Sequence, residues 1–160
     1  MTFFENAVKS SDPIHWFGDM EADHYVQTSG IAGERFFKHL VQKGKFLGST
    51  CRKCGVTYVP CQIYCEFCFS QLSEKDEVEL NGKGVVESFT IVKMDKDGNS
   101  REKPVVVGLI RLAPNATPFL HIIGEAKEDE LRIGMKVEAV LKPKTAREGR
   151  ITDILYFRPV

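Results

Sequence analysis

Four of the five cysteines form two Cys-x-x-Cys pairs, and this spacing constrains the fold more than any other feature of the sequence. The pairs are Cys51 with Cys54 and Cys65 with Cys68, and ten residues separate them. A tetrahedral zinc site takes four thiolates at about 2.3 Å, and two facing pairs supply them. Gly55, directly after the first pair, suits the unusual backbone dihedrals of such a turn. The spacing therefore predicts a zinc site formed by Cys51, Cys54, Cys65 and Cys68.

The predicted site is structural and holds one zinc ion per chain, because four protein ligands leave no position open for water or substrate. About 25 residues cannot bury enough apolar surface to fold alone, so metal binding supplies their folding free energy. Two alternatives remain: iron also accepts four thiolates, and a single Cys-x-x-Cys pair can serve redox chemistry. The fifth cysteine, Cys61, is expected to be a small buried or half-exposed thiol.

The rest of the sequence predicts a mainly β fold with N-terminal helices. Apolar residues between 31 and 44 recur at helical spacing, and Gly44 is a suitable stop. Apolar runs then predict several strands, among them 105–112, which is expected to be buried on both faces, 119–123 and 136–141. This series, with a short helical segment before the last two strands, resembles the order of a five-stranded OB-fold barrel.

Three regions are predicted: an N-terminal arm and helix (1–45), a rubredoxin-like zinc ribbon (46–75) and an OB-fold domain (76–160). The first 30 residues carry bulky side chains without a clear period, namely Phe3, Phe4, Trp16, Phe17 and Tyr25. Exposed aromatic residues rarely stay solvated in large patches. This arm is therefore expected to lie either on its own domain or on a partner subunit.

Charge and hydropathy exclude several classes of protein. The 22 basic and 22 acidic side chains give a formal net charge of zero, which disfavours a general polyanion-binding surface. No apolar run approaches the roughly 18 residues of a membrane span. The first residues are aromatic and acidic and lack the layout of a signal peptide. We therefore expect no membrane association and a cytoplasmic location, where disulfides are rare.

The sequence holds no nucleophile elbow, phosphate-binding loop or dinucleotide fingerprint. His121 and Cys61 are isolated candidates, and a lone histidine in an apolar strand is usually packed or hydrogen-bonded. Neighbouring motifs do not combine a nucleophile, a base and an orienting group. The sequence therefore predicts no catalytic residue and no activity of the chain alone. A stand-alone enzyme that uses His121 or Cys61 stays an alternative.

The order of these motifs resembles a known family. An aromatic helix runs into Cys51-Arg52-Lys53-Cys54-Gly55, which is followed by Tyr58-Val59-Pro60, by Tyr64-Cys65-Glu66-Phe67-Cys68 and by a glycine-punctuated strand over 82–90. Over residues 31–158 this layout is similar to the zinc-ribbon/OB-fold family first catalogued as domain of unknown function thirty-five. The first 30 residues lie outside the resemblance.

The resemblance implies a function as well as a fold. It implies a non-catalytic, acyl-CoA-binding scaffold that assembles with a thiolase-like protein into a hetero-oligomer, as an accessory subunit of a thiolase-type acyltransferase complex. The ligand implied is a coenzyme A thioester, and one assignment within the class is the degradation of an aromatic or other bulky acyl-CoA. These are expectations from the resemblance and do not follow from spacing or composition.

Coenzyme A binding needs a few local cations and an apolar slot, not a basic protein overall. The candidate cations and apolar walls are Lys45, Arg52, Lys53, Arg111, Phe36, Phe37 and Phe119. The alternative function is that of a single-stranded nucleic-acid-binding module, because OB barrels often bind single strands in a cationic groove. The zero net charge disfavours that alternative.

Overall fold

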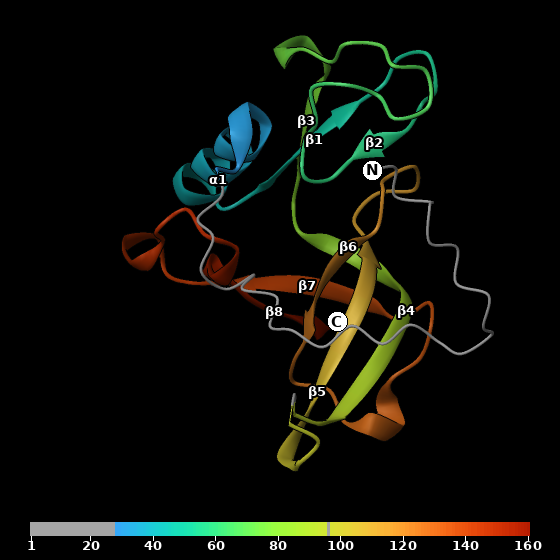
Figure 1. Ribbon diagram of the computed structural model, residues 1–160, viewed down its shortest axis with the longest axis vertical. Coiled ribbons are helices and arrows are strands. Elements are labelled where there is room, and N and C mark those ends of the chain that lie inside the picture. The colour runs from blue at the N-terminus through green and yellow to red at the C-terminus, as the bar shows by residue number, and fades with distance from the viewer. Residues whose placement is uncertain (1–27, 96) are drawn as a thin grey trace, which may run out of the picture.

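The computed structural model describes residues 28–95 and 97–160, which form a helix, a small sheet and a barrel (Figure 1). Residues 1–27, which hold the aromatic side chains of the predicted arm, lie outside the described residues. Of the predicted N-terminal helices, the described part contains α1 (Gly30–Lys43). It leads into a sheet of order β2-β1-β3, formed by β1 (Phe46–Thr50), β2 (Thr57–Tyr58) and β3 (Glu77–Leu80).

Five strands form a closed barrel with the order β4-β5-β6-β8-β7. A parallel bridge between Ile123 and Phe157 joins β6 to β8, and the other neighbouring strands run antiparallel. This arrangement confirms the predicted OB fold. The strands are β4 (Lys83–Met94), β5 (Ser100–Arg111), β6 (Phe119–Ile123), β7 (Lys136–Leu141) and β8 (Ile154–Pro159), and the short 3-10 helices are η2 (Glu74–Asp76), η3 (Glu128–Glu130), η4 (Lys144–Ala146) and η5 (Ile151–Asp153).

Helix α1 ends at the predicted stop. Gly44 adopts a left-handed conformation with φ 67°, and its N–H donates to the Leu40 carbonyl at 2.9 Å. The barrel completes this cap, because Arg147 Nη1 donates to the carbonyl oxygens of Leu40 and Val41 at 3.2 and 3.4 Å. Arg147 thereby holds the C-terminus of the helix against the loop between β7 and β8. Within the described residues, no helix has the length and apolar composition to cross a bilayer.

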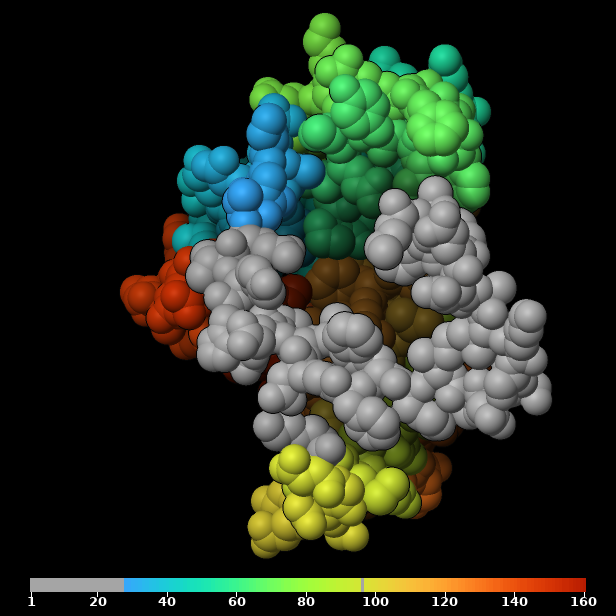
Figure 2. Space-filling model, viewed as in Figure 1, coloured from blue at the N-terminus to red at the C-terminus, as the bar shows by residue number. Residues whose placement is uncertain are grey.

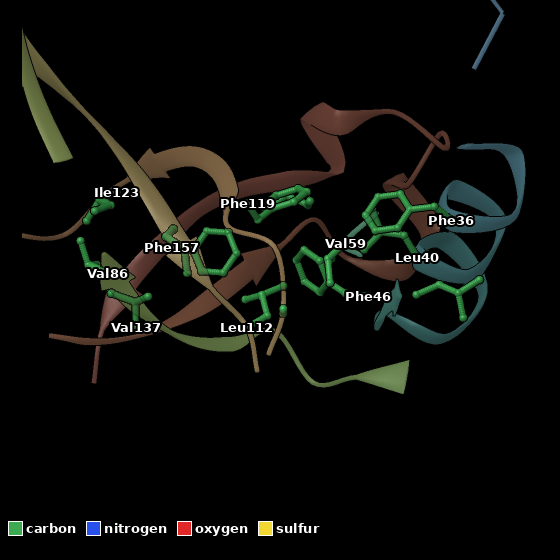
Figure 3. Packing of buried hydrophobic residues seen from close by; sticks show 14 of the residues in the cluster. Phe36, Leu40, Phe46, Val59, Val86, Leu112, Phe119, Ile123, Val137 and Phe157 are labelled. Carbon is green, nitrogen blue, oxygen red and sulfur yellow. The ribbon is translucent and has the colours of Figure 1, made fainter. Parts of the chain in front are cut away.

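One apolar core connects the helix, the small sheet and the barrel. Phe46 of β1 lies at its centre, with ring centroids 6.0 Å from Phe36 on α1, 5.5 Å from Phe119 on β6 and 5.9 Å from Phe157 on β8. All four side chains are buried. Figure 3 shows a row of apolar side chains that runs from the helix past Phe46 into the barrel. The first strand of the ribbon therefore shares its core with the barrel.

The structure differs from the sequence prediction in two strands. The run 105–112 was predicted to be buried on both faces, and this is wrong: alternate residues of β5 are buried, while Val107 and Leu109 remain partly exposed. A barrel strand has one inward face and one outward face, and the continuous apolar run hides this difference. Strand β3 pairs with β1 and not with the barrel, so the small sheet continues past the predicted boundary at residue 75.

Asp153 is a buried carboxylate that organises the loop between β7 and β8. It accepts hydrogen bonds from the backbone N–H groups of Glu148 at 3.0 Å, Gly149 at 2.7 Å and Arg150 at 3.2 Å. Lys142 Nζ lies 3.4 Å from its Oδ1. Burial alone would raise the pKa of Asp153, but these donors outweigh burial and lower the pKa.

We expect Asp153→Asn to lower the free energy of unfolding by about 1–3 kcal/mol at pH 7, because an amide offers one acceptor oxygen where the carboxylate offers two. A carboxylate whose pKa is lowered in the folded state stabilises the fold above its unfolded pKa of about 3.9, and this contribution is lost as pH falls through the folded pKa. Urea unfolding at pH 7 and at pH 3 measures both effects. Equal acid sensitivity in the wild type and the variant would contradict the assignment.

Candidate metal centre and ligand-binding surfaces

The four predicted metal ligands come together between the two turns of the ribbon. Their sulfur atoms all lie within 4.8 Å of one another. Cys51 Sγ is 3.6 Å from Cys68 Sγ, and Cys65 Sγ is 3.8 Å from Cys54 Sγ. Four sulfurs placed about 2.3 Å from one zinc ion in a tetrahedron would be about 3.8 Å apart. The donor set therefore fits a single zinc ion in a closed, structural shell.

The two Cys-x-x-Cys pairs are built on the same backbone turn. In the first turn the Gly55 N–H donates to the Cys51 carbonyl at 2.7 Å, and in the second the Phe69 N–H donates to the Cys65 carbonyl at 2.9 Å. Both donors have positive φ, 71° for Gly55 and 54° for Phe69. This conformation costs a non-glycine residue roughly 1–2 kcal/mol. The role predicted for Gly55 is confirmed, whereas an aromatic residue at the matching position was not foreseen.

Tyr58 lies beneath the metal site and has no role in the sequence prediction. It is fully buried, and its hydroxyl is 3.3 Å from Cys65 Sγ and accepts a hydrogen bond from the Glu66 N–H at 3.0 Å. The hydroxyl lowers the pKa of Cys65 to about 6, whereas hydrogen bonding to Cys68 raises the pKa of Cys54 to about 12. Four adjacent thiols cannot all ionise unless a cation balances their charge, as a bound metal does. A buried tyrosine hydroxyl usually has a polar partner, but this rule applies to any tyrosine and does not single out Tyr58 in the sequence.

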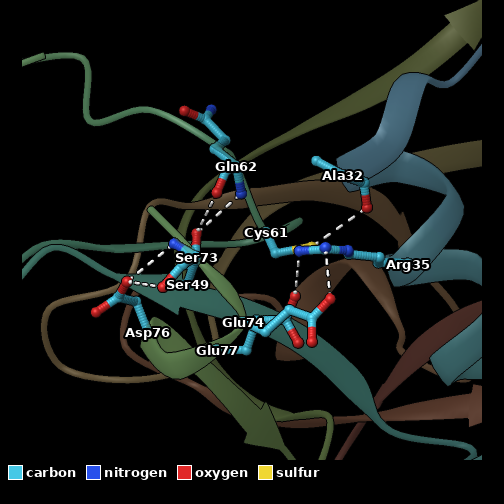
Figure 4. Close-up of polar contacts among 9 residues, drawn as sticks. All are labelled: Ala32, Arg35, Ser49, Cys61, Gln62, Ser73, Glu74, Asp76 and Glu77. Atoms are coloured by element: carbon cyan, nitrogen blue, oxygen red, sulfur yellow. Dashed lines mark hydrogen bonds and ion pairs between the residues drawn. The ribbon is translucent and has the colours of Figure 1, made fainter. Parts of the chain in front are cut away.

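Polar contacts fasten α1 to the ribbon (Figure 4). Arg35 Nη2 lies 2.7 Å from Glu74 Oε1, and Arg35 Nη1 lies 3.2 Å from Glu77 Oε1. Cys61 is buried, and its thiol donates to the Ala32 carbonyl at 3.2 Å, as expected of a packed cysteine. Burial raises the pKa of the Cys61 thiol to about 11, which makes it a poor nucleophile at neutral pH.

His121, the other residue considered for catalysis, is half-buried on β6. Its ring stacks on Phe119 with centroids 5.9 Å apart and planes 6° apart, and it meets the edge of Phe157 at 5.8 Å. Burial lowers the pKa of His121. The geometry therefore agrees with a packed histidine.

The aromatic candidates for acyl-CoA binding divide between the core and the surface. Phe36 is fully buried and Phe119 is 4% exposed, and both belong to the central apolar core. Both rings are closed off from solvent in this conformation, which does not favour the prediction that Phe36 and Phe119 form ligand walls. Phe37, one position after Phe36, is half-buried and lines a groove beside α1. Neighbouring helix residues point about 100° apart, which separates the two phenylalanines.

The cationic candidates are distributed over the surface. Lys45 Nζ lies 3.0 Å from Glu79 Oε2. Arg52 Nε lies 2.8 Å from Asp76 Oδ1, and Lys53 is exposed on the first turn of the ribbon. These three cations therefore surround the small sheet and do not converge on one cavity.

Arg111, at the end of β5, is the candidate that lines a substantial hollow. It pairs with Glu87 of β4 and donates to the Pro114 carbonyl at 3.1 Å. With Lys83 and Lys136 it surrounds a hollow of about 510 Å³ at the end of the barrel. The sequence prediction missed both lysines, because two strands distant in sequence bring them together. The walls are otherwise mostly apolar: Gly84, Val85, Leu112, Ala113, Pro114, Val137 and Val160.

A second exposed surface lies on the ribbon, which forms one end of the molecule, opposite the β4–β5 hairpin (Figure 2). We call it the knuckle surface, and it comprises apolar side chains around the second Cys-x-x-Cys pair. Their exposed fractions are 39% for Ile63, 54% for Tyr64, 70% for Phe67 and 80% for Phe69. Exposed apolar clusters of this kind mark interaction sites.

Comparisons with known proteins agree with this architecture. The family described as "ChsH2, rubredoxin-like zinc ribbon domain" matches residues 39–73, and "ChsH2, C-terminal OB-fold domain" matches residues 77–142. A "DUF35 domain-containing scaffold protein" of Methanocaldococcus jannaschii is 29% identical over 128 residues, which cover 79% of this chain and 89% of the relative. A protein of the same description from Methanothermobacter thermautotrophicus is also 29% identical over 128 residues, with 78% and 94% covered.

Two solved structures share the fold. A chain of the Ltp2-ChsH2(DUF35) aldolase superposes with a TM-score of 0.58 at 22% identity, over 84% of this chain and 98% of that chain, and shows likeness of fold alone. A DUF35-family protein of unknown function from Sulfolobus solfataricus superposes with a TM-score of 0.61 at 32% identity, over 88% of this chain and 91% of that chain. With its zinc-ribbon cysteines and its OB barrel, this chain belongs to the DUF35 family.

Proposed function

We propose that this chain is a non-catalytic scaffold subunit that binds acyl-CoA for a thiolase-like partner in the cytoplasm. The description of two relatives as scaffold proteins supports the scaffold role. The fold shared with a chain of the Ltp2-ChsH2(DUF35) aldolase supports assembly with an enzyme. The thiolase-like partner and the bulky or aromatic acyl-CoA come from the family resemblance, and two surfaces of this chain are suited to them.

Phe69 is the observation that carries the scaffold role. Its backbone has φ 54°, where glycine would avoid a cost of roughly 1–2 kcal/mol. Its side chain is 80% exposed, so burial of the ring within the chain does not compensate for that cost. A strained residue with an exposed aromatic ring points to a function outside the isolated fold.

The rest of the knuckle surface is suited to the same role. Tyr64 lines one hollow together with Phe69, and Phe67 exposes a third aromatic ring on the same turn. Aromatic residues dominate the binding energy of protein interfaces. The metal-bound turn that would carry these rings is short and cross-linked, so little conformational entropy is lost on binding. We infer that the thiolase-like partner covers this surface with an apolar groove.

The hollow at the end of the barrel is the best location for coenzyme A. Its three cations, Lys83, Arg111 and Lys136, suit phosphate groups, and its apolar walls suit the pantetheine arm and an acyl chain. Lys83 and Lys136 have no carboxylate within ion-pair distance among residues 28–95 and 97–160. Arg111 is thus the member of the sequence-predicted set that keeps this role.

The nucleic-acid alternative receives less support from the same surfaces. OB folds bind single strands with aromatic and cationic side chains on the face of their second and third strands. Here that face, on β5 and β6, presents Val107, Leu109, Leu120 and Ile122. Salt-sensitive retention of single-stranded DNA or RNA at low salt would reverse this ranking.

Phe69→Gly is expected to weaken binding of the thiolase-like partner about thirtyfold or more without loss of stability. Removing the strained residue leaves the free energy of unfolding unchanged or raises it by about 1 kcal/mol, whereas the partner loses an aromatic contact worth roughly 2 kcal/mol or more. Co-purification with a co-expressed thiolase-like protein from the same organism measures binding, and urea unfolding measures stability.

Glu125→Gly is the matched control for this experiment. Glu125 is the other non-glycine residue with φ 54° in the described part of the chain. It lies in the loop after β6, where its carboxylate accepts a hydrogen bond from the Tyr156 hydroxyl. Its replacement relieves the same backbone strain and is expected to leave partner binding intact. Co-purification of the Phe69 variant at the wild-type level would contradict the proposal that the knuckle surface binds the partner.

Titration of the wild type with coenzyme A tests the ligand role separately. If the double variant Lys83→Ala with Lys136→Ala bound coenzyme A as tightly as the wild type, the hollow at the end of the barrel would not be the binding site.

A further inference from the structure

The hollow at the end of the barrel, which we call the barrel hollow, adjoins a second hollow of about 440 Å³ beside the ribbon. Arg111 and Pro114 line both of them. The second one, the ribbon hollow, is lined by residues 54–56 and Phe67 of the ribbon and by residues 115–117 of the loop between β5 and β6. Ligand pockets have volumes of roughly 300–1,000 Å³. The two hollows together therefore offer a ligand-sized groove from the barrel to the second cysteine turn.

Hydrogen bonds hold the loop that forms the common wall of the two hollows. The Arg111 guanidinium donates to the Pro114 carbonyl at 3.1 Å. The loop also pairs with the ribbon, because the Thr57 N–H donates to the Asn115 carbonyl at 2.8 Å and the Thr117 N–H donates to the Thr57 carbonyl at 2.7 Å. A groove with such a wall is largely preformed, so little conformational entropy is lost when a ligand binds.

The two ends of the groove differ in charge. Lys83 and Lys136 line the barrel hollow. At the other end the exposed Cys54 lines the ribbon hollow, and four thiolates around one zinc or iron ion leave an excess of negative charge. Arg111 is the one cation among the described residues that line the ribbon hollow, and it is already paired with Glu87. Phosphate groups are therefore suited to the barrel hollow, and an uncharged group is suited to the ribbon hollow.

Phe67 provides the ribbon hollow with an aromatic ring that a ligand can reach. Its side chain is 70% exposed, and Val56 and Ala116 add apolar surface to the same hollow. Tyr64 and Phe69, the other aromatic residues of the knuckle surface, line a different hollow. Aromatic rings attract one another beyond the effect of buried area. The ribbon hollow is therefore suited to an aromatic or other bulky acyl group.

On the basis of the acyl-CoA role proposed above, we propose that the ligand lies along this groove in one direction. Its phosphates bind at Lys83 and Lys136, and its acyl group packs against Phe67. The pantetheine arm then crosses the common wall at Arg111 and Pro114. This direction places the thioester beside the second cysteine turn, where the partner binds. Phe67 then contacts the ligand, and the rest of the knuckle surface remains available to the partner.

Calorimetric titration of the metal-loaded full chain with coenzyme A and with benzoyl-CoA tests this direction. Phe67→Ala is expected to weaken benzoyl-CoA binding roughly three- to tenfold, which is the effect of one contact between aromatic rings. It is expected to leave coenzyme A binding unchanged, which also shows that the variant is folded. Lys83→Ala with Lys136→Ala is expected to weaken both ligands by the same factor, roughly tenfold or more.

Phe69→Ala is the matched control, because it removes an exposed ring of the same turn that does not line the ribbon hollow. It is expected to leave both affinities unchanged. Equal weakening of coenzyme A and benzoyl-CoA by Phe67→Ala would place the adenine on the ring and overturn the proposed direction. Unchanged affinities for both ligands in that variant would also overturn it, while an effect of the lysine variant would leave the acyl-CoA role standing. If the wild type bound neither ligand, the acyl-CoA role would fall as well.

Discussion

Replacing Cys54 by serine is expected to release the metal and unfold the ribbon between residues 51 and 72, while α1 and the barrel stay folded. The apolar residues around the metal form a small separate cluster of Cys51, Tyr58, Cys65 and Leu72. Such a cluster is too small to fold without the metal, whose binding free energy in small zinc domains is about 10–16 kcal/mol. Cys54 is exposed, so its replacement removes a ligand and almost no packing.

Elemental analysis of the fresh protein and hydrogen exchange of the variant measure this outcome. The wild type is expected to hold about one equivalent of metal per four-thiolate site, and the element found decides between zinc and iron. Cys61→Ala is the control, because Cys61 is a buried cysteine outside the four-thiol cluster and is expected to keep the metal. A Cys54→Ser protein whose residues 51–72 remain protected from exchange would disprove a structural metal.

Phe46→Ala is expected to lower the free energy of unfolding by about 3–5 kcal/mol. The Phe46 ring is fully buried and contacts Phe36, Phe119 and Phe157, which come from three different elements. The cavity left by the substitution would lie where helix, small sheet and barrel meet, so the surrounding side chains cannot close it without moving whole elements. The metal is expected to stay bound, because Phe46 belongs to the central core and not to the cluster around the thiols.

Urea unfolding followed by circular dichroism measures this loss. Phe67→Ala provides a control of the same chemistry at a 70% exposed position, where the expected change is within about 0.5 kcal/mol. If Phe46→Ala cost no more than Phe67→Ala, the ribbon and the barrel would not share a core. A transition that splits into two steps would indicate that Phe46 couples the two parts.

Local patterns predict much of this fold. The predicted helix 31–44 corresponds to α1, and the strands 119–123 and 136–141 correspond to β6 and β7. The cysteine spacing predicts the four thiols that the structure brings together, and Gly44 and Gly55 adopt the left-handed conformations expected of them. Each of these features depends on neighbours within a few residues, which is the range over which sequence patterns report.

The sequence did not predict features that depend on contacts between residues far apart in the chain. The two-residue strand β2 is too short to show a period, and it exists because it pairs with β1. Arg147 caps a helix whose last carbonyls are more than 100 positions earlier in the chain. The hollow at the end of the barrel joins Lys83 and Lys136, which the pairing of β4 with β7 brings together. The sequence places Phe36 and Phe37 about 100° apart on a helix, but only the packing of α1 shows that Phe36 is the core residue and Phe37 the surface residue.

The central row of phenylalanine side chains has a consequence for how the two ends of the molecule relate. Because Phe46 packs at once against helix, ribbon and barrel, a hinge between the metal end and the barrel end would have to open this core. The shared core therefore holds the ribbon and the barrel in a fixed relative orientation. A protein bound to the second cysteine turn would thereby also determine the orientation of the barrel.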